Sequence, residues 1–230
     1  MATVRALAGR FYRATVPIGL RRVLARRAFG TYSIRPFDRH HCIFVHLPKT
    51  GGISVSTSLF GNLAGGHRSL ADYREIFGDD LLAAYFKFAF VRNPWDRLLS
   101  AYRFLLAGGK TREDRRWAQV HLTAYSCFED FVMRGLHRPE VLDWIHFRPQ
   151  WRFVTLPGQA APTLDFIGRF ERLGTDFAAV ADRLGIEATL RHLNRSSDSG
   201  FAAAYTPAAV ARVGEIYARD IELFGYAPHA

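Results

Sequence analysis

The sequence contains little of what cross-links a chain or carries it through a membrane. Its 230 residues include two cysteines, Cys42 and Cys127, which are too few for a disulfide framework and suit a reducing compartment. No window approaches the roughly 18 consecutive apolar residues that a spanning helix needs. Internal repeats, low-complexity tracts and flexible linkers are also missing, so we expect one main domain.

Lysine is scarce as well, so the positive charge is almost entirely arginine. The chain has 31 basic and 21 acidic residues, a net charge of +10, and 28 of the basic residues are arginine. Hydrophobic residues make up 49% and charged residues 23% of the chain. This composition is typical of a globular protein with a core and excludes wholesale disorder.

The charge is concentrated in a basic N-terminal arm over residues 1–40. The arm carries nine arginines and one acid, Asp38, whereas residues 41–230 are nearly neutral. Pro17 and Gly19 interrupt it, and a short amphipathic helix is expected over 20–29. The helix either packs on the domain with a solvated arginine face or contacts an anionic membrane surface. Nucleic-acid binding is disfavoured because no recognition motif follows, and the missing apolar run argues against a secretory signal.

Short apolar runs alternate with helical patterns along residues 41–230, the expected main domain. Buried strands are expected at 42–47, 86–91 and 164–170. Apolar periodicity and capping residues predict helices at 52–60, 71–77, 81–85, 94–106, 128–134, 175–184 and 207–224. This alternation predicts a three-layer α/β fold with a central, mainly parallel sheet, and a helical insertion at about 107–150.

A glycine-containing turn follows the first expected strand, in the segment FVHLPKTGGISVS at 44–56. Two glycines permit a tight turn, and the amides that open the next helix attract anions. The motif offers a cation, hydroxyls and amides from Lys49, Thr50, Gly51, Gly52, Ile53 and Ser54. Because the lysine precedes the glycines, this is not a Walker A loop, which disfavours an ATP or GTP kinase.

A second anion site is expected where the next strand ends, in FAFVRNPWDRLLSAYRF at 88–104. Arg92 lies at the carboxyl end of that strand, the edge at which open α/β sheets bind ligands. Ser100 lies ~9 Å along the following helix from Pro94, so it could share one anion with Arg92. Two anion sites at neighbouring strand ends predict a ligand with phosphates at both ends.

The paired motifs PKTGGIS and VRNPWDRLLSAY resemble those of sulfotransferases that use 3′-phosphoadenosine 5′-phosphosulfate (PAPS). The similarity is to the carbohydrate branch that includes heparan sulfate 2-O and chondroitin sulfotransferases. It covers about residues 40–226, with DFIGRFE at 165–171, HLNRS at 192–196 and ARDIELFGY at 218–226 fitting bacterial members. The resemblance implies the P-loop-like sulfotransferase fold and transfer of a sulfuryl group from PAPS to a carbohydrate or glycolipid hydroxyl, without a metal.

The resemblance also implies roles for individual residues. Residues 49–54 would hold the 5′-phosphosulfate, and Arg92 with Ser100 would hold the 3′-phosphate. Arg195 and Ser196 fall where the family places a loop near the donor. Lys49 would neutralise the charge that grows on the oxygen bridging phosphate and sulfate.

His67 is the candidate general base for the acceptor hydroxyl. A histidine suits this role because its ordinary pKa lies near neutrality, and the pattern Gly-His-x-Ser-Leu resembles the heparan sulfate 2-O enzymes. The alternative is a loop histidine that caps the helix at 71–77. His46 is expected beneath the PKTGG loop. Glu171 is an alternative base, although Glu171 and Arg169 are expected to tie the third strand to the core.

The insertion is the expected place for acceptor contacts. His121, His137 and His146 are candidates, and arginines with tryptophans suit carboxylates and pyranose rings. The alternative is a solvated helical cap with tryptophans in its core. The residues in question are Arg112, Arg115, Arg116, Arg134, Arg138, Arg148, Arg152, Trp117, Trp144 and Trp151.

Two other functions remain open: a nucleotide-dependent kinase and a non-catalytic glycan or nucleotide binder on the same fold. The kinase is also disfavoured because no metal-binding acid is evident after a second strand. The intact Lys49, Arg92, Ser100 and His67 argue against the binder. The missing membrane anchor and the arginine bias lead us to expect a bacterial cytoplasmic protein that acts near the membrane. The acceptor and the oligomeric state are not specified by the sequence.

Overall fold

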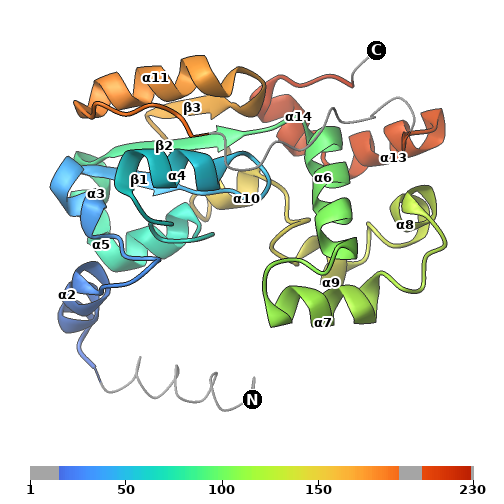
Figure 1. Cartoon of the computed structure of the whole chain (residues 1–230), viewed down its shortest axis with the longest axis horizontal. Helices are drawn as coiled ribbons and strands as arrows, with labels where there is room; N and C mark the ends of the chain where they lie inside the picture. Colours follow the sequence, from blue (N-terminus) through green and yellow to red (C-terminus); the bar gives the residue numbers. More distant parts are fainter. Residues whose placement is uncertain (1–15, 192–203, 229–230) are drawn as a thin grey trace.

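A parallel sheet forms the centre of the protein in a computed structural model that describes residues 16–191 and 204–228 (Figure 1). Its strands are β1 (Cys42–Val45), β2 (Phe86–Val91) and β3 (Phe166–Arg169). They pair in the order β1-β2-β3, with Phe44 opposite Phe88 and Phe88 opposite Phe166. All four side chains of β1 are buried, as expected for a strand covered on both faces. The expected parallel α/β sheet is confirmed.

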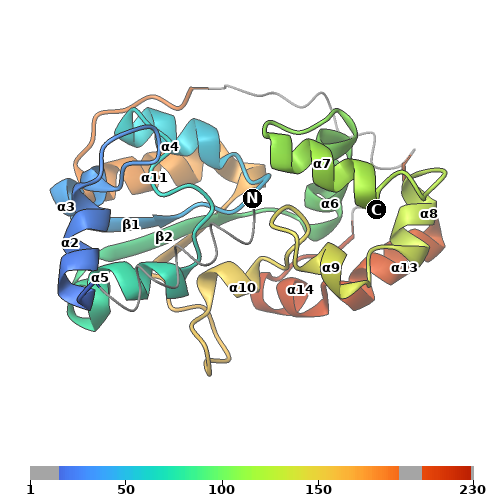
Figure 2. The ribbon, with the colours of Figure 1, turned by 90° about the horizontal axis from the view of Figure 1, so that it is seen from below.

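Helices cover both faces of this sheet. Figure 2 shows α4 and α11 over one face and α5 and α10 over the other, which confirms the three layers. The helices are α2 (Ile18–Arg27), α3 (Arg35–His40), α4 (Gly52–Phe60), α5 (Leu70–Ala84), α6 (Pro94–Leu106), α7 (Arg112–His121), α8 (Phe128–Arg134), α9 (Pro139–Leu142), α10 (Trp151–Val154), α11 (Leu173–Leu184), α13 (Pro207–Ile216) and α14 (Ala218–Phe224), with a 3₁₀ turn at Phe170–Arg172.

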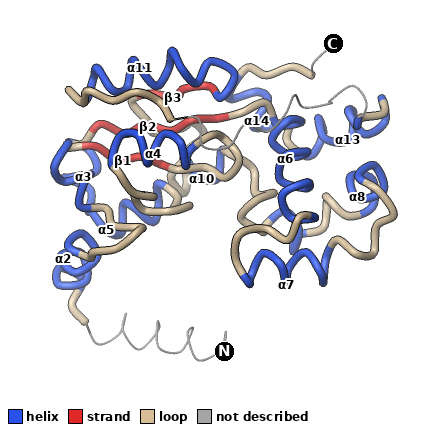
Figure 3. The backbone as a smooth tube through the Cα atoms, in the orientation of Figure 1, coloured by secondary structure: helices blue, strands red, loops and turns tan. Residues whose placement is uncertain are grey.

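Two hydrophobic cores hold the two halves of the molecule. The sheet core contains Phe44, Phe88 and Phe90, and a second, helical core contains Trp95 and Phe131. The insertion builds this second core, since α7 packs against α6 and α8 against α13. Figure 3 shows the division, with the strands on one side and helices alone on the other. The insertion is therefore a structured wall beside the sheet edge.

Several helix boundaries differ from the sequence expectations. The expected helix at 207–224 is wrong as one piece, because the backbone leaves helical geometry at Tyr217 (φ −104°, ψ 22°) and α14 starts anew. The break turns α14 so that its Asp220 accepts hydrogen bonds from the amides of Gln150 and Trp151, both at 2.8 Å. The two short helices expected at 71–77 and 81–85 are the two parts of α5, which the non-helical backbone of Gly78 (φ 78°, ψ 172°) separates as expected.

The C-terminal part of the basic arm folds with the domain. Ile34 and Phe37 are buried in the sheet core, and α3 packs against β1. The amphipathic helix expected at 20–29 is α2, displaced by two residues, and it packs against α5. Residues 34–40 thus contribute apolar side chains to the core of the sheet.

Candidate functional site

One cavity of about 740 Å³ collects most of the predicted site residues. It lies where β1 and β2 end, between the loop that enters α4, the start of α6 and the insertion. Lys49, Gly51, Gly52, Ile53, Ser54, His67, Arg92 and Ser100 all line it. The structure thus brings the two anion motifs and the candidate base together, although Lys49 and Arg92 lie 43 positions apart in the sequence. Arg195 and Ser196 lie outside the described residues.

Close packing fixes the backbone of the PKTGG loop. A Cβ on Gly52 would lie 2.0 Å from Cδ2 of His46, and a Cβ on Gly51 would lie 2.7 Å from Cδ2 of Leu173. Gly52 is therefore required by the His46 ring and Gly51 by its left-handed φ of 78°, and His46 packs beneath the loop as predicted. Lys49 adopts φ 69°, a left-handed conformation that costs a non-glycine residue about 1–2 kcal/mol. The fold tolerates this strain at the residue that carries the cation into the cavity.

Thr50 supports the loop through its side chain. It is buried, and its hydroxyl donates to the carbonyl of Leu47 at 3.0 Å. The side chain thus holds the turn closed, which leaves the backbone amide as the part of Thr50 that could serve a ligand. The next amides open α4 at Gly52, where the first turn of a helix has no intrahelical acceptors. Ser54 stands in that first turn and lines the cavity.

Two cations enter the cavity from apolar surroundings. The Lys49 ammonium lies 4.4 Å from the centre of the Phe104 ring, and the Arg92 guanidinium lies 4.2 Å from that of Phe170. Burial lowers the pKa of Lys49 to about 8, with further lowering by the charges of Arg92 and Lys110. Burial lowers the pKa of Arg92 as well. Within the described part of the chain neither has an ion-pair partner, and the Arg92 Nε is buried without an acceptor. An anion placed here would relieve the cost of burying both charges.

Backbone contacts hold Arg92 in place. Its amide donates to Oε1 of Gln150 at 2.9 Å, and Nε2 of Gln150 donates back to its carbonyl at 2.8 Å. Its guanidinium Nη1 donates to the carbonyl of Lys49 at 3.3 Å. Gln150 is itself held because Asp220 accepts from its amide. The insertion and the C-terminal helix thus position the second anion motif.

Glu171 has a structural role, as the sequence analysis expected. Its carboxylate accepts from the amide of Asn93 at 2.7 Å and from the hydroxyl of Tyr226 at 3.0 Å. Arg169 donates to the carbonyl of Phe224. Both residues of DFIGRFE thus tie β3 to its neighbours, and the Glu171 carboxylate already serves two donors.

His67 is oriented by a backbone carbonyl. Its Nδ1 lies 3.0 Å from the oxygen of His46, and because a carbonyl can only accept, Nδ1 carries the proton. The other ring nitrogen, Nε2, then holds the lone pair. Burial lowers the pKa of His67 below 6.5, although the hydrogen bond to His46 opposes this shift. His67 is therefore a neutral imidazole near pH 7 in a tautomer that can accept a proton at Nε2.

A second histidine faces the same cavity, paired with a carboxylate. Nε2 of His146 lies 3.0 Å from Oδ1 of Asp114, and both side chains are buried. Asp114 also completes the capping box that starts α7. The Nδ1 of His146 is buried and has no hydrogen-bond partner within the described residues. Burial lowers the pKa of His146 to about 4 despite the carboxylate.

Of the three insertion histidines, His146 alone is among the described residues that line the cavity. Its ring centre lies 6.2 Å from that of His67. His121 instead stacks on Trp117, with ring centres 4.7 Å apart, and His137 is exposed. The sequence analysis did not identify Asp114, the aspartate that orients His146. Its position three residues after Thr111 matches the capping-box pattern of a helix N-terminus.

Arg97 is a positioning residue that the sequence analysis also missed. It is 2% exposed, and its guanidinium donates to the carbonyls of Pro48 at 3.5 Å, His146 at 3.2 Å and Arg148. It therefore joins the PKTGG loop to the insertion wall. No sequence pattern distinguishes it, since arginine is ordinarily a surface residue.

The acceptor side of the cavity differs from the expected arrangement. The insertion contributes Lys110, Trp144 and His146 to the lining, whereas the arginines expected to contact an acceptor are absent from it among the described residues. Trp144 stacks on Trp117 with ring centres 5.0 Å apart, so part of the tryptophan set belongs to the helical core. Lys110 is thus the cation that the insertion places at the cavity.

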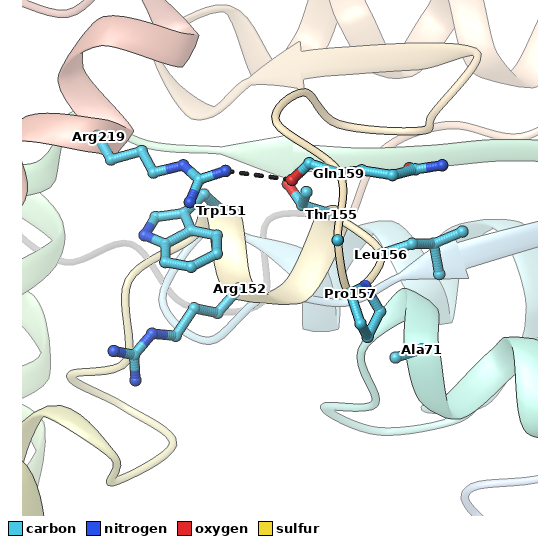
Figure 4. Close-up of a pocket in the computed structure, with 9 residues that line it drawn as sticks. Ala71, Trp151, Arg152, Thr155, Leu156, Pro157, Gln159 and Arg219 are labelled. Atoms are coloured by element: carbon cyan, nitrogen blue, oxygen red, sulfur yellow. Dashed lines mark hydrogen bonds between the residues drawn. The ribbon is translucent and has the colours of Figure 1, made fainter.

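A smaller pocket of about 470 Å³ lies elsewhere, between α10 and the first turn of α5. Figure 4 shows Arg219 over the ring of Trp151, with the guanidinium 3.8 Å from the ring centre. That guanidinium already donates to the carbonyls of Gln159 and Ala160, and Arg152 pairs with Asp143 at 2.8 Å. Arg219 and Arg152 are therefore both paired with oxygen atoms of the protein. In the larger cavity, by contrast, Lys49 and Arg92 have no ion-pair partner among the described residues.

Comparison with known proteins agrees with this site. Residues 34–227 match the sequence profile of the sulfotransferase family. The chain is 30% identical over 184 residues to carbohydrate sulfotransferase 14 of Mus musculus, covering 70% of this chain and 47% of that protein. It is 27% identical over 172 residues to carbohydrate sulfotransferase 12 of Xenopus laevis, covering 63% of this chain and 41% of that protein. The chain thus spans less than half the length of these relatives. No solved structure matches it.

Proposed function

This chain belongs to the sulfotransferase family, and on that premise we propose that it transfers the sulfuryl group of PAPS to a hydroxyl of a carbohydrate or glycolipid acceptor. One observation carries the proposal. Two cations without ion-pair partners among the described residues, the half-buried Lys49 and the buried Arg92, meet at the start of α4 in one cavity. Such a site favours a ligand with anionic groups at two points, which PAPS has.

The residues present fit this donor. The cavity volume of about 740 Å³ lies within the roughly 300–1,000 Å³ of small-molecule sites. Lys49, Ser54 and the opening amides of α4 would hold the 5′-phosphosulfate. Arg92, with its unpartnered Nε, and Ser100 would hold the 3′-phosphate. The donor supplies an activated sulfuryl group, and the protein supplies positioning and charge.

Lys49 is suited to stabilise the leaving group. In sulfuryl transfer the acceptor oxygen forms a bond to sulfur while the bond between sulfur and the bridging oxygen breaks. Negative charge then grows on the phosphate side, as in phosphoryl transfer. The half-buried ammonium of Lys49, beside the Phe104 ring, interacts with that charge more strongly than it would in water.

His67 is the group proposed to take the proton of the acceptor hydroxyl. The hydrogen bond from Nδ1 to His46 leaves the Nε2 lone pair available, and its lowered pKa keeps the ring neutral near pH 7. His146, oriented by Asp114, is suited to accept a hydrogen bond from the acceptor at Nδ1. Trp144 and Lys110 line the same side and suit a pyranose ring with an acidic substituent.

Thermal shift tests the donor site first. Adenosine 3′,5′-bisphosphate, the product left after transfer, should raise the melting temperature more than ATP with magnesium. Stabilisation by ATP with magnesium alone would support a kinase and overturn the proposal.

Radiolabelled PAPS with a panel of desulfated polysaccharides and glycolipids then tests transfer. Label should enter an acceptor, and Lys49→Ala should abolish incorporation. Binding of the bisphosphate without transfer to any member of the panel would favour the non-catalytic binder.

A further inference from the structure

Three of the four arginines of α2, Arg21, Arg22 and Arg26, are half-buried, whereas the large apolar residues of this helix are exposed. Nε of Arg22 donates to the carbonyl of Glu75 at 3.0 Å. Arg26 donates to both oxygens of Asp38, at 2.7 to 3.0 Å. The contacts with α5 and α3 thus use the polar side of the helix. The expected solvated arginine face is wrong for these two residues.

Solvent meets the apolar side instead. The exposed fractions are 51% for Leu20, 41% for Val23, 50% for Leu24 and 83% for Phe29, which follows the helix. None of the ten described residues of α2 is buried. We call Leu20, Val23, Leu24 and Phe29 the α2 apolar surface. Apolar side chains gathered on one exposed helix face are a mark of an interaction surface.

Cations border the α2 apolar surface. Arg27 ends the helix and is exposed, and Arg35 is exposed as well. The Arg35 guanidinium lies 4.1 Å from the centre of the Phe29 ring. An apolar face beside exposed arginines is complementary to an anionic lipid bilayer, where the side chains enter the interface and the guanidinium groups meet headgroups.

The same segment leads to the mouth of the cavity. Tyr32 is 58% exposed and lines the cavity, and its ring lies 3.2 Å from where a Cβ on Gly66 would be. Two residues, Gly30 and Thr31, separate it from Phe29. Figure 1 shows α2 outside the three layers, at the lower left below α3 and α5.

We propose that the α2 apolar surface docks on an anionic bilayer and so holds the mouth of the cavity next to the membrane. Among the described residues no helix is long and apolar enough to cross a membrane, and the proposed contact is a helix lying in the interface. That contact does not depend on sulfuryl transfer. Its relevance to a glycolipid acceptor rests on the proposed function.

Co-sedimentation of the full chain with vesicles tests the proposal. The protein should bind 3:1 POPC:POPG vesicles, bind pure POPC less, and be released from POPG by 0.5 M NaCl. The double variant Leu20→Ser/Leu24→Ser should lower the partition coefficient about tenfold, since each leucine then loses roughly half a side chain of interfacial burial. The matched control is Val120→Ser, which replaces an apolar side chain of α7 that is 64% exposed. This variant should bind the vesicles as well as the wild type.

Three outcomes would overturn the proposal. The first is that the wild-type chain fails to bind POPG vesicles. The second is that the double variant binds as well as the wild type, which would assign binding to another segment. Alternatively, analytical ultracentrifugation finds a wild-type dimer that Leu20→Ser/Leu24→Ser converts to monomer, which makes a second copy the occupant. Stabilisation by adenosine 3′,5′-bisphosphate should be unchanged in both variants, so that lost vesicle binding is separated from misfolding and from failure of the donor site.

Discussion

The guanidinium of Arg92 donates a hydrogen bond to the backbone carbonyl of Lys49, with Nη1 3.3 Å from the oxygen. The first residue directly follows β2, and the second lies in the loop after β1. One contact thus joins the two anion motifs before any ligand is bound. The PKTGG loop therefore positions the Arg92 side chain, and both are proposed to bind the same donor.

Arg92→Ala should weaken the binding of adenosine 3′,5′-bisphosphate by about 10- to 100-fold, the loss of a charged hydrogen bond of roughly 1.5–3 kcal/mol. Isothermal titration calorimetry measures the affinity. Arg183→Ala removes an exposed arginine of α11 and should leave it unchanged. Equal affinity in Arg92→Ala and the wild type would show that the 3′-phosphate site lies elsewhere.

Donor binding should depend on pH through Lys49. Its pKa in the free protein is lowered to about 8, and an ammonium attracts the anion only while it is protonated. The affinity for adenosine 3′,5′-bisphosphate should be greatest below pH 8 and fall about tenfold by pH 9 to 10. Lys49→Arg keeps its charge over this range, so its affinity should be nearly constant. The same slope in both proteins would assign the titration to another group.

His67→Ala should lower the turnover number by about 10²- to 10⁴-fold, the usual contribution of a general base, and leave bisphosphate affinity unchanged. The turnover of the wild type should rise with pH through a value below 6.5, because burial lowers the pKa of His67. His146→Gln is the matched comparison and should retain more turnover than His67→Ala. The opposite order would make His146 the base.

Gly52→Ala should destabilise the fold by at least about 1–3 kcal/mol, the usual cost of overpacking. The added Cβ would lie 2.0 Å from Cδ2 of the buried His46. Gly174→Ala is the control, since no atom lies within 4 Å of its Cβ position in α11, and helix propensity favours alanine by up to about 1 kcal/mol. Urea unfolding measures both. Equal stability of the two variants would contradict the packing described for the PKTGG loop.

Local patterns allowed much of the fold to be predicted. The helix at 52–60 begins and ends where the glycines placed it, and Asn93 and Thr206 cap α6 and α13 as expected. The break at Tyr217 had no local sign, because the reason for it is the contact of Asp220 with Gln150 and Trp151. Contacts between residues about seventy positions apart do not leave a periodic pattern.

The sequence by itself determined which residues bear charge at the strand ends, Lys49 and Arg92, because a strand followed by glycines or by Asn-Pro is a local pattern. Only the tertiary structure decided how those charges are surrounded. Packing buries Arg92 and half-buries Lys49 without ion pairs among the described residues, brings Asp114 onto His146, and turns Arg22 and Arg26 toward the protein. The two cysteines excluded a disulfide framework, and the few lysines left arginine as the source of nearly all the positive charge. The neighbours that the fold brings to each cation decide whether it meets solvent, protein or an anionic ligand.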